Sequence, residues 1–250
     1  MSQEIKNDVF IFCGGLGTRL RPYTLDLPKP LLKIGDYFPL FFVCSQLKKC
    51  GFNTALVNYS YGEIFFKDAS ERIKAELDFE VRLIEESQPM GHSGVLKSAQ
   101  YQIKTDKFLA LNGDTLSRLS PDITYGLLDS CNEQTPMSVL AQPLSAIRPL
   151  GYNHENHLVS IGEKDFIKAD IKGWVDSAGV YAMHKSMLDL VPKNEFFGLF
   201  GEDDIVERLV KSNKNVYIWL HKSPILQYQI GTVEEFLNLL NKPELIEQFS

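Results

Sequence analysis

A glycine-rich segment with two basic residues is the part of this sequence best suited to chemistry. The run GGLGTRLRPYTLDLPKPLL extends from Gly14 to Leu32 and begins with three glycines in four positions. Glycine lets the backbone bend sharply and brings bare N–H groups close to an anion. Arg19 and Lys29 add fixed positive charge, and a hydrogen bond to a charged group contributes about 1.5–3 kcal/mol. The segment therefore predicts a phosphate-binding loop.

Two other phosphate-binding motifs do not match this loop. No lysine is followed by Ser or Thr at the Walker A spacing, and GGLGTR lacks the G-x-G-x-x-G order of dinucleotide-binding proteins. A glycine-rich turn between a strand and a helix that binds nothing stays an alternative. The accompanying Arg19 and Lys29 favour the phosphate-binding interpretation.

At these residues the chain resembles the sugar-1-phosphate nucleotidyltransferases, or NDP-sugar pyrophosphorylases, whose signature reads GGxGTRLxPxTxxxPKPLL. Nearly every fixed position of that signature is present. Because glycine and proline are each only about 5–7% of average residues, such agreement is seldom accidental. The resemblance implies an enzyme that joins a sugar 1-phosphate to a nucleoside triphosphate, releasing pyrophosphate and making an NDP-sugar, in cell-surface polysaccharide synthesis. Within the family, the sequence most resembles the mannose-, heptose- and N-acetylmuramate-1-phosphate branch. The resemblance leaves the identity of the base and of the sugar open.

The resemblance continues at two segments that follow strand ends. NYSYGEI from Asn58 resembles the family's N-x-x-Y segment, and EESQPMGHSGVLKSA from Glu85 resembles E-x-x-P-L-G-T-A-G-A-L, which lies against the base in relatives. His92 and Ser93 stand where relatives often have Thr-Ala, and His92 is either a base-pocket residue or an incidental loop residue. The nucleotide-binding residues implied by the resemblance are Gly14, Gly15, Gly17, Thr18, Glu86, Pro89 and Gly91.

Sugar-phosphate binding is implied for residues farther along the chain. GEK at Gly162–Lys164 resembles E-K-P, whose Lys reaches the sugar phosphate, with Asp165 in place of Pro. DSAGVYAM resembles N-A-G-I-Y-V-F, with Ser177 in place of Asn. A solvated surface lysine is the alternative for Lys164. The full implied set is Asn112, Gly151, Glu163, Lys164 and Gly179.

A magnesium site is implied around Asp114, which occupies the family's G-D pair in LNGDTL. The alternative is that Asp114 caps a turn. The family's closing D-I-G-T-P, whose Asp is a second metal ligand, reads QIGTV here, with Gln229. An amide oxygen can contact a hard cation but lacks the negative charge, so Gln229 is a doubtful ligand.

The reaction implied is an in-line attack of the sugar phosphate oxygen on the α-phosphorus of the triphosphate. Such chemistry needs positioning and charge neutralisation rather than a nucleophilic side chain. Arg19, Lys29 and Asp114 are the catalytic candidates, with Lys164 fixing the sugar phosphate.

Two other classes of function stay open. One is a regulatory or catalytically weak homologue that binds nucleotide or NDP-sugar, and Gln229 in place of the family's Asp supports this alternative. A nucleotide-sugar glycosyltransferase would use a related sheet, but LNGDT does not supply its usual D-x-D strand end. Pyrophosphate release from nucleotide and sugar phosphate distinguishes the predicted enzyme from both.

Apolar strands alternating with helical segments must position these residues. Strands are predicted at residues 9–13, 54–58, 80–85, 107–112 and 137–142, and later at 158–163, 174–183, 215–221 and 225–230. Helices are predicted over 40–52, 121–132, 185–191, 202–210 and 233–249. This alternation is typical of parallel strands joined by helical crossovers and covered on both faces, with ligands beyond the strands' carboxyl ends.

The fold class predicted is α/β: a single Rossmann-like, mostly parallel mixed sheet with helices on both faces. One domain is expected over residues 1–250, with a nucleotide-binding half to about 125 and a sugar-phosphate-binding half from about 126. The acidic run at Glu202–Asp204, near the family's E-x-D segment, is predicted to be a charged helix start.

Composition limits the partners and the location. The 250 residues are 44% hydrophobic and 23% charged with a net charge of −6, which argues against nucleic-acid binding. No stretch approaches the roughly 20 apolar residues of a membrane span, and no signal peptide is recognisable, so a cytoplasmic protein is expected. The four cysteines match neither a zinc site nor a disulfide framework. The expected partners are a nucleoside triphosphate and a sugar 1-phosphate, with a homo-oligomer left open.

Overall fold

The computed structural model describes residues 7–144, 149–167, 169–201, 203–222, 225–242, 244 and 248–249. The chain groups into two compact units. Unit 1 comprises Met1–Pro89, Leu111–Pro121 and Leu226–Ser250, and unit 2 comprises Met90–Ala110 and Asp122–Ile225. The chain therefore enters each unit more than once. The single domain with halves meeting near residue 125 stays a prediction.

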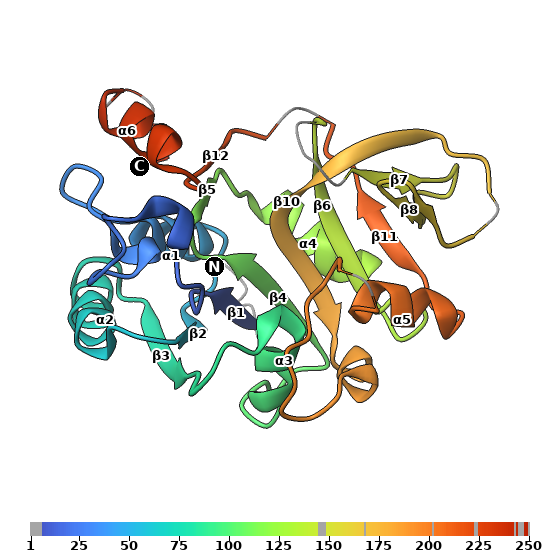
Figure 1. Ribbon diagram of the computed structural model, residues 1–250, viewed down its shortest axis with the longest axis horizontal. Helices are drawn as coiled ribbons and strands as arrows, with labels where there is room; N and C mark the ends of the chain where they lie inside the picture. The colour runs from blue at the N-terminus through green and yellow to red at the C-terminus, as the bar shows by residue number, and fades with distance from the viewer. Residues whose placement is uncertain are drawn as a thin grey trace. The chain divides into compact units, whose positions relative to one another are not determined.

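Unit 1 is built on three parallel strands in the order β3-β2-β1. They are β1 (Asp8–Phe12), β2 (Thr54–Tyr59) and β3 (Glu80–Glu85). The helices α1 (Pro39–Lys49) and α2 (Glu63–Leu77) connect them along the chain, as parallel pairing requires (Figure 1). Helix α1 ends at Lys49, short of the predicted end at residue 52, and Gly51 follows it with a φ of 93°, in the left-handed region that favours glycine.

Strand β3 departs from the prediction that the early strands are buried on both faces. Its residues alternate between exposed and less exposed positions, whereas β2 is buried over five of its six residues. The reason is the sequence EVRLIE, in which charged residues alternate with apolar ones at a strand that ends the order within unit 1.

The rest of unit 1 surrounds an apolar cluster. Its elements are the 3-10 helices η1 (Thr18–Leu20) and η2 (Lys29–Leu31), the antiparallel pair β5 (Thr115–Ser117) and β12 (Gln227–Gln229), and helix α6 (Val233–Leu240). The cluster consists of Leu20, Leu32, Ile34, Phe42, Leu116, Ile230, Phe236, Leu239 and Phe249. The glycine-rich loop and the QIGT segment are therefore anchored in one core, because both contribute residues to it.

Unit 2 contains a mixed sheet around the long strand β10 (Gly173–His184). Its other strands are β4 (Lys107–Asn112), which runs on into unit 1, β6 (Met137–Gln142), β7 (Leu150–Tyr152), β8 (Leu158–Ile161), β9 (Lys164–Asp165) and β11 (Val216–Trp219). Strand β10 pairs antiparallel with β6 and β7, β6 pairs parallel with β11, and β7-β8-β9 forms an antiparallel ribbon. The helices are α3 (Gly91–Ser98), α4 (Pro121–Ser130), η3 (Lys185–Leu190) and α5 (Ile205–Lys211).

The helices predicted at 185–191 and 233–249 differ most from the prediction in type or extent. Residues 185–190 form a 3-10 helix, and only Met187 and Leu188 in it are buried, so the segment lacks an apolar stripe over several α-helical turns. The last helix is assigned over Val233–Leu240, and residues 243, 245–247 and 250 lie outside the described residues. Within the described chain, no helix is long and apolar enough to cross a membrane.

Candidate functional site

The start of the glycine-rich loop touches a buried carboxylate. A Cβ added at Gly14 would overlap Glu86 Oε1 and Asn58 Nδ2, so only glycine fits there. The Asn58 side chain lies between the start of the glycine-rich loop and Glu86. Its Oδ1 accepts from Cys13 N at 2.9 Å, and its Nδ2 donates to Glu86 Oε1 at 3.3 Å. The Ser60 hydroxyl has one proton and two acceptors within hydrogen-bond distance, the Gly14 carbonyl and, at 2.9 Å, Glu86 Oε1. We call Asn58, Ser60 and Glu86 the loop anchor.

The loop anchor joins the glycine-rich loop, the segment from Asn58 and the segment from Glu85 in one hydrogen-bond network. Glu86 is 5% exposed, and a buried carboxylate needs hydrogen-bond donors, which Asn58 and Ser60 supply. The network joins the end of β2 and the residue after β3 to the residues after β1. Glu86 is therefore placed against the loop's backbone, while Pro89 is exposed.

The second part of the loop is shaped by Gly17. Its φ of 61° lies in the left-handed region, and the Thr24 hydroxyl donates to its carbonyl at 2.7 Å. The 3-10 helix η1 starts directly afterwards, with Leu20 buried and Arg19 exposed. Gly15 and Thr18 are exposed as well, and a Cβ at Gly15 would meet no atom within 4 Å. This arrangement leaves backbone and guanidinium donors accessible to an anion.

Lys29 and Asp114 form an ion pair with each other. Their side chains are 14% and 19% exposed, so water screens the pair only in part. Asp114 Oδ1 also accepts from the Thr115 hydroxyl at 3.1 Å. The structure thus brings together two catalytic candidates that the sequence places 85 positions apart (114 − 29).

Gln229 lies on the strand that pairs with the residue after Asp114. In the antiparallel pair β5–β12, Gln229 is opposite Thr115, and Ile230 N donates to the Asp114 carbonyl at 3.3 Å. Gln229 is exposed. The QIGT segment therefore lies beside Asp114, and the part of Gln229 in metal binding stays a prediction.

A capping box holds the QIGT segment in place. The Thr232 hydroxyl accepts from Glu235 N at 3.2 Å, and Glu235 Oε2 accepts from Gly231 N at 2.7 Å and Thr232 N at 2.9 Å. A Cβ added at Gly231 would lie 3.7 Å from Arg19 Nη2. The start of α6 thus brings Gly231 next to the Arg19 guanidinium.

The donor set around Asp114 suits a hard cation that brings most of its own ligands. It offers one carboxylate and the Thr115 hydroxyl, and Gln229 is opposite Thr115 on the paired strand. Among the described residues, no group of three or more His, Cys, Asp and Glu could hold a metal ion. Magnesium is usually held by one or two carboxylates together with substrate phosphates, so these residues fit it as a companion of a triphosphate.

Asn112 is partly buried at the end of β4 with one unsatisfied atom. Its Oδ1 is buried and, within the described residues, has no hydrogen-bond partner. A buried carbonyl oxygen without a donor is costly and is uncommon in folded proteins. The next residue, Gly113, is required by close packing, since a Cβ there would overlap Cys13 Sγ.

In unit 2, backbone hydrogen bonds to Phe197 hold the start of α3, which belongs to the segment that the resemblance places against the base. Gly91 has a φ of 70°, and a Cβ there would lie 2.7 Å from the Phe197 carbonyl oxygen. That carbonyl accepts from Ser93 N at 2.9 Å and Gly94 N at 3.0 Å, and the Ser93 hydroxyl donates to the Gly198 carbonyl at 2.7 Å. Ser93, unusual for the resemblance, therefore attaches α3 to residues 197–198, and His92 is exposed.

The sugar-phosphate candidates Gly151, Glu163 and Lys164 lie on the β7-β8-β9 ribbon. Gly151 pairs with Ser160, and Ile161 pairs with Lys164 across the turn that contains Glu163. A Cβ at Gly151 would lie 3.0 Å from the Trp174 ring, so glycine allows the indole to pack there. Glu163 is exposed.

Lys164 has a partner that the sequence did not reveal. Its Nζ lies 2.8 Å from Oε2 of Glu207, a buried acid on α5. Lys164 itself remains half exposed. The sequence does not predict this pairing, because 43 positions separate the two residues and no motif contains both of them.

Gly179, the last sugar-phosphate candidate, occupies an irregular point of β10. Its φ of 69° coincides with a register shift between Ser177 and Tyr181. The Ser177 hydroxyl accepts from Gly179 N at 3.1 Å and donates to the Tyr181 hydroxyl at 3.0 Å. Ser177, which replaces the family's Asn, therefore supports the bulge, and Gly179 is required by conformation.

The predicted charged helix start is found at Asp204, the N-cap of α5. Its carboxylate accepts from Gly198 N at 2.8 Å and Gly201 N at 2.5 Å and thereby fixes the preceding loop. Asp203 N donates to Glu207 Oε2 at 2.9 Å. Glu202 lies outside the described residues.

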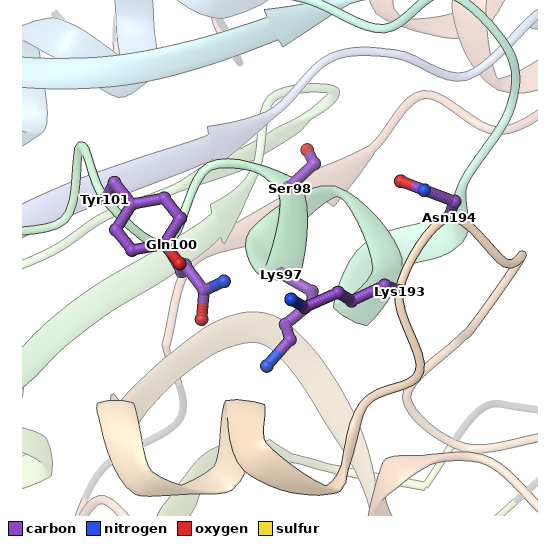
Figure 2. A pocket seen from close by; sticks show the side chains of 6 residues that line it. All are labelled: Lys97, Ser98, Gln100, Tyr101, Lys193 and Asn194. Carbon is purple, nitrogen blue, oxygen red and sulfur yellow. The ribbon is translucent and has the colours of Figure 1, made fainter.

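A small surface cavity in unit 2 involves none of the predicted residues. Its lining side chains come from α3, the residues after it and a facing segment (Figure 2): Lys97, Ser98, Gln100, Tyr101, Lys193 and Asn194. Lys97 Nζ donates to the Leu188 carbonyl at 2.8 Å, so one of its two lysines has a structural partner.

The geometry defines an α/β protein with an anchored glycine loop beside a lysine–aspartate pair. Residues 9–139 match the family described as Nucleotidyl transferase. A heptose enzyme of Campylobacter jejuni, named D-glycero-alpha-D-manno-heptose 1-phosphate guanylyltransferase, is 38% identical over 185 residues, covering 72% of this chain and 76% of that protein. Mannose-1-phosphate guanylyltransferase of Mycobacterium tuberculosis is 26% identical over 242 residues, which cover 92% of this chain and 62% of that longer protein.

Solved structures agree with the fold class. HddC from Yersinia pseudotuberculosis, complexed with GMP-PN, superposes with a TM-score of 0.74 at 24% identity, covering 94% of this chain and 99% of that one. The mixed, mostly parallel sheet with helices predicted from the sequence is therefore confirmed. The chain belongs to the nucleotidyl transferase family. Its predicted class, a sugar-1-phosphate nucleotidyltransferase that makes an NDP-sugar, is confirmed with it.

Proposed function

We propose that this enzyme transfers GMP from GTP to the 1-phosphate of a manno-configured sugar, a heptose or mannose, releasing pyrophosphate. The observation that carries the proposal is the 38% identity with a heptose 1-phosphate guanylyltransferase, over 72% of this chain. The mannose-1-phosphate guanylyltransferase relative supports the same base and a sugar of the same configuration. Transfer to either sugar uses GTP, and we assign the binding of its triphosphate to the anchored glycine loop.

At the triphosphate, the proposal assigns binding to the loop backbone and charge neutralisation to Arg19 and Lys29. Gly14, Gly15, Gly17 and Thr18 present N–H groups, and the loop anchor keeps the first of them in place. Arg19 is exposed and stays free to meet the phosphates. Lys29 turns from a partner of Asp114 into a partner of the charge that grows on the phosphates, which favours transition-state binding.

Magnesium is proposed as the cofactor, held by Asp114 with help from the Gln229 amide. When bound, the ion would supply positive charge that neutralises the triphosphate. The Asp114 carboxylate would hold the ion, and the Thr115 hydroxyl, which donates to Oδ1 at 3.1 Å, fixes the orientation of that carboxylate.

At the sugar phosphate, the proposal assigns Lys164 as the main cationic contact. Its ammonium is half exposed and projects from a two-stranded turn that also carries Glu163. The Asn112 carbonyl oxygen, buried without a partner among the described residues, would accept from a sugar hydroxyl. Pro89 and Gly91 are assigned to the nucleotide base as the resemblance implies, and Glu86 is assigned to nucleotide binding through the loop anchor.

The test is a matrix of pyrophosphate release. GTP, CTP, UTP, dTTP and ATP are each combined with mannose 1-phosphate, a D-glycero-D-manno-heptose 1-phosphate and glucose 1-phosphate at saturating magnesium. We expect GTP with a manno-configured sugar phosphate to give the highest kcat/KM. A higher kcat/KM with any other nucleotide would contradict the guanylyl assignment, and preference for glucose 1-phosphate would contradict the sugar.

Gln229 supports a second candidate, a protein that binds the sugar nucleotide without turnover. The amide removes one negative charge from the position beside Asp114. This candidate predicts stabilisation by GDP-mannose in a thermal-shift assay, where ligand at 100 times its Kd adds about 2.7 kcal/mol, with no pyrophosphate release at any magnesium concentration. A cytoplasmic location and a homo-oligomer stay predictions.

A further inference from the structure

A buried acid outside all the predicted site residues holds the proposed sugar-phosphate lysine. Glu207 on α5 is only 6% exposed. Its Oε2 accepts from Lys164 Nζ at 2.8 Å and from Asp203 N at 2.9 Å, and its Oε1 lies 2.9 Å from Lys211 Nζ. These three donors lower the pKa of the Glu207 carboxyl to about 2, Lys164 having the largest effect. The carboxylate is therefore an anion at neutral pH.

The two cations on this carboxylate differ in what they connect. Lys211 is one helical turn from Glu207 on the same helix, and its side chain is 62% exposed. Lys164 comes from β9, so its pair with Glu207 joins two separate elements. The Lys164 Nζ also lies 6.0 Å from the centre of the Phe166 ring. The lysine is thus held on two sides.

An ammonium group has three hydrogen-bond donors, and Glu207 uses one of them. Among the described residues, no other hydrogen bond is made by Lys164 Nζ, whose side chain is half exposed. A free lysine side chain loses much rotational freedom on binding, and ordering it beforehand removes that loss from the binding step. The remaining donors can therefore meet an anion from the solvent side at little entropic cost.

We propose that Glu207 is a positioning residue: it orients the Lys164 ammonium so that its remaining donors meet the phosphate of the sugar 1-phosphate. This inference rests on the proposed function, in which Lys164 contacts that phosphate. The opposite physical effect is competition, because a carboxylate on Lys164 also cancels part of its charge. Burial of Glu207 and exposure of Lys164 favour positioning. The buried carboxylate stays in place, while the exposed side of the Lys164 ammonium is open to a phosphate from solvent.

The test is a double-mutant cycle with Glu207→Gln, Lys164→Met and both together, measured with GTP and mannose 1-phosphate. Positioning predicts that Glu207→Gln raises KM for mannose 1-phosphate about 10-fold, the size expected for losing a charge-assisted hydrogen bond. KM for GTP stays within about 2-fold. Because Glu207 acts through Lys164, the double variant is no worse than Lys164→Met alone.

Lys211→Met is the matched control, since it removes the other ammonium from the same carboxylate. We expect it to leave KM for mannose 1-phosphate within about 2-fold. Three results would overturn the inference: a lower KM in Glu207→Gln, which means competition; equal shifts in both KM values, which means a general structural role; or additive losses in the double variant.

A readout that needs no turnover separates this inference from the proposed function. Lys164 is acetylated with an N-hydroxysuccinimide ester under limiting conditions and quantified by mass spectrometry, with increasing mannose 1-phosphate. We expect wild type to be protected, and Glu207→Gln to need about 10-fold more ligand for half protection. Protection without pyrophosphate release contradicts the proposed reaction and leaves the positioning role standing. Absence of protection in wild type places Lys164 outside the site and overturns the inference.

Discussion

The two units hold their proposed ligand-binding cations in different ways. In unit 1, Lys29 pairs with Asp114, and both belong to the set of residues implied by the resemblance. In unit 2, Lys164 pairs with Glu207, which belongs to no recognised motif. The first pair is mostly buried on both sides, with exposures of 14% and 19%, whereas in the second only the acid is buried.

This difference separates two tasks. A mostly buried pair of opposite charges must separate or rearrange when phosphate and metal arrive, so its members can change partners during the reaction. An exposed lysine on a buried carboxylate keeps its partner and offers its remaining donors. We infer that Lys29 takes part in stabilising the charge that grows on the transferred and leaving phosphates, while Lys164 binds the sugar phosphate in the ground state as well as in the transition state.

The largest expected effect comes from removing the cation of the first pair. Lys29→Met should lower kcat about 10²–10³-fold, the usual effect of deleting a group that stabilises transition-state charge. Lys33→Met, an exposed lysine of the same segment, is the matched control and should stay within about 2-fold. Pyrophosphate release is measured at a temperature where circular dichroism shows both variants folded. If Lys29→Met raised only KM, the lysine would bind ground state and transition state equally, and the comparison would fail.

The contrast also shows what the sequence could reveal. The strands at 80–85, 107–112 and 137–142 have the predicted bounds, because their apolar runs are strong local signals. The sequence does not predict strands β5, β7 and β9, since a segment of two or three residues forms a strand only when a distant partner pairs with it. The Gly14–Leu32 segment carries its own motif. Glu207 carries none, because its pairing with Lys164 depends on tertiary structure alone.

The second prediction tests whether the loop anchor orders the phosphate loop. Glu86→Ala removes the acceptor of the buried Asn58 amide, and leaving a buried donor unsatisfied costs about 1–3 kcal/mol, while the Ser60 hydroxyl keeps the Gly14 carbonyl. We expect KM for GTP to rise about 10-fold and KM for mannose 1-phosphate to stay within about 2-fold. Glu85→Ala, its exposed neighbour, is the matched control and should change neither. Equal rises in both KM values would mean that Glu86 only stabilises the fold.

A third, smaller effect concerns the metal. Gln229→Asp adds a second carboxylate opposite Thr115, and another negative charge near a cation is attractive even when water screens it. We expect the magnesium concentration for half-maximal rate to fall several-fold with little change in maximal rate. Gln227→Asp, two residues earlier on β12, is the strand control. An unchanged magnesium requirement would place Gln229 outside the metal site, whereas activity only in the Asp variant would support the binding protein.

The smallest expected effect is a pH dependence of stability that belongs to the second pair. The groups facing the Glu207 carboxylate are Lys164, Lys211 and Asp203, and the pKa of Glu207 is lowered to about 2. An acid whose pKa is lowered by folding stabilises the native state above its unfolded pKa, about 4.3, and loses this contribution as the pH falls toward 2.

Glu207→Gln should therefore lower the melting temperature most at neutral pH, by an amount on the order of 2 °C. The difference from wild type should shrink between about pH 4.5 and pH 2, where the wild-type carboxyl becomes protonated. Glu85→Gln, which removes an exposed carboxyl, is the matched control and should shift melting far less. Differential scanning calorimetry across this range decides the matter. A Glu207→Gln difference that stays constant with pH would mean that the Glu207 carboxyl stabilises through shape, and that Lys164 is not held by its charge.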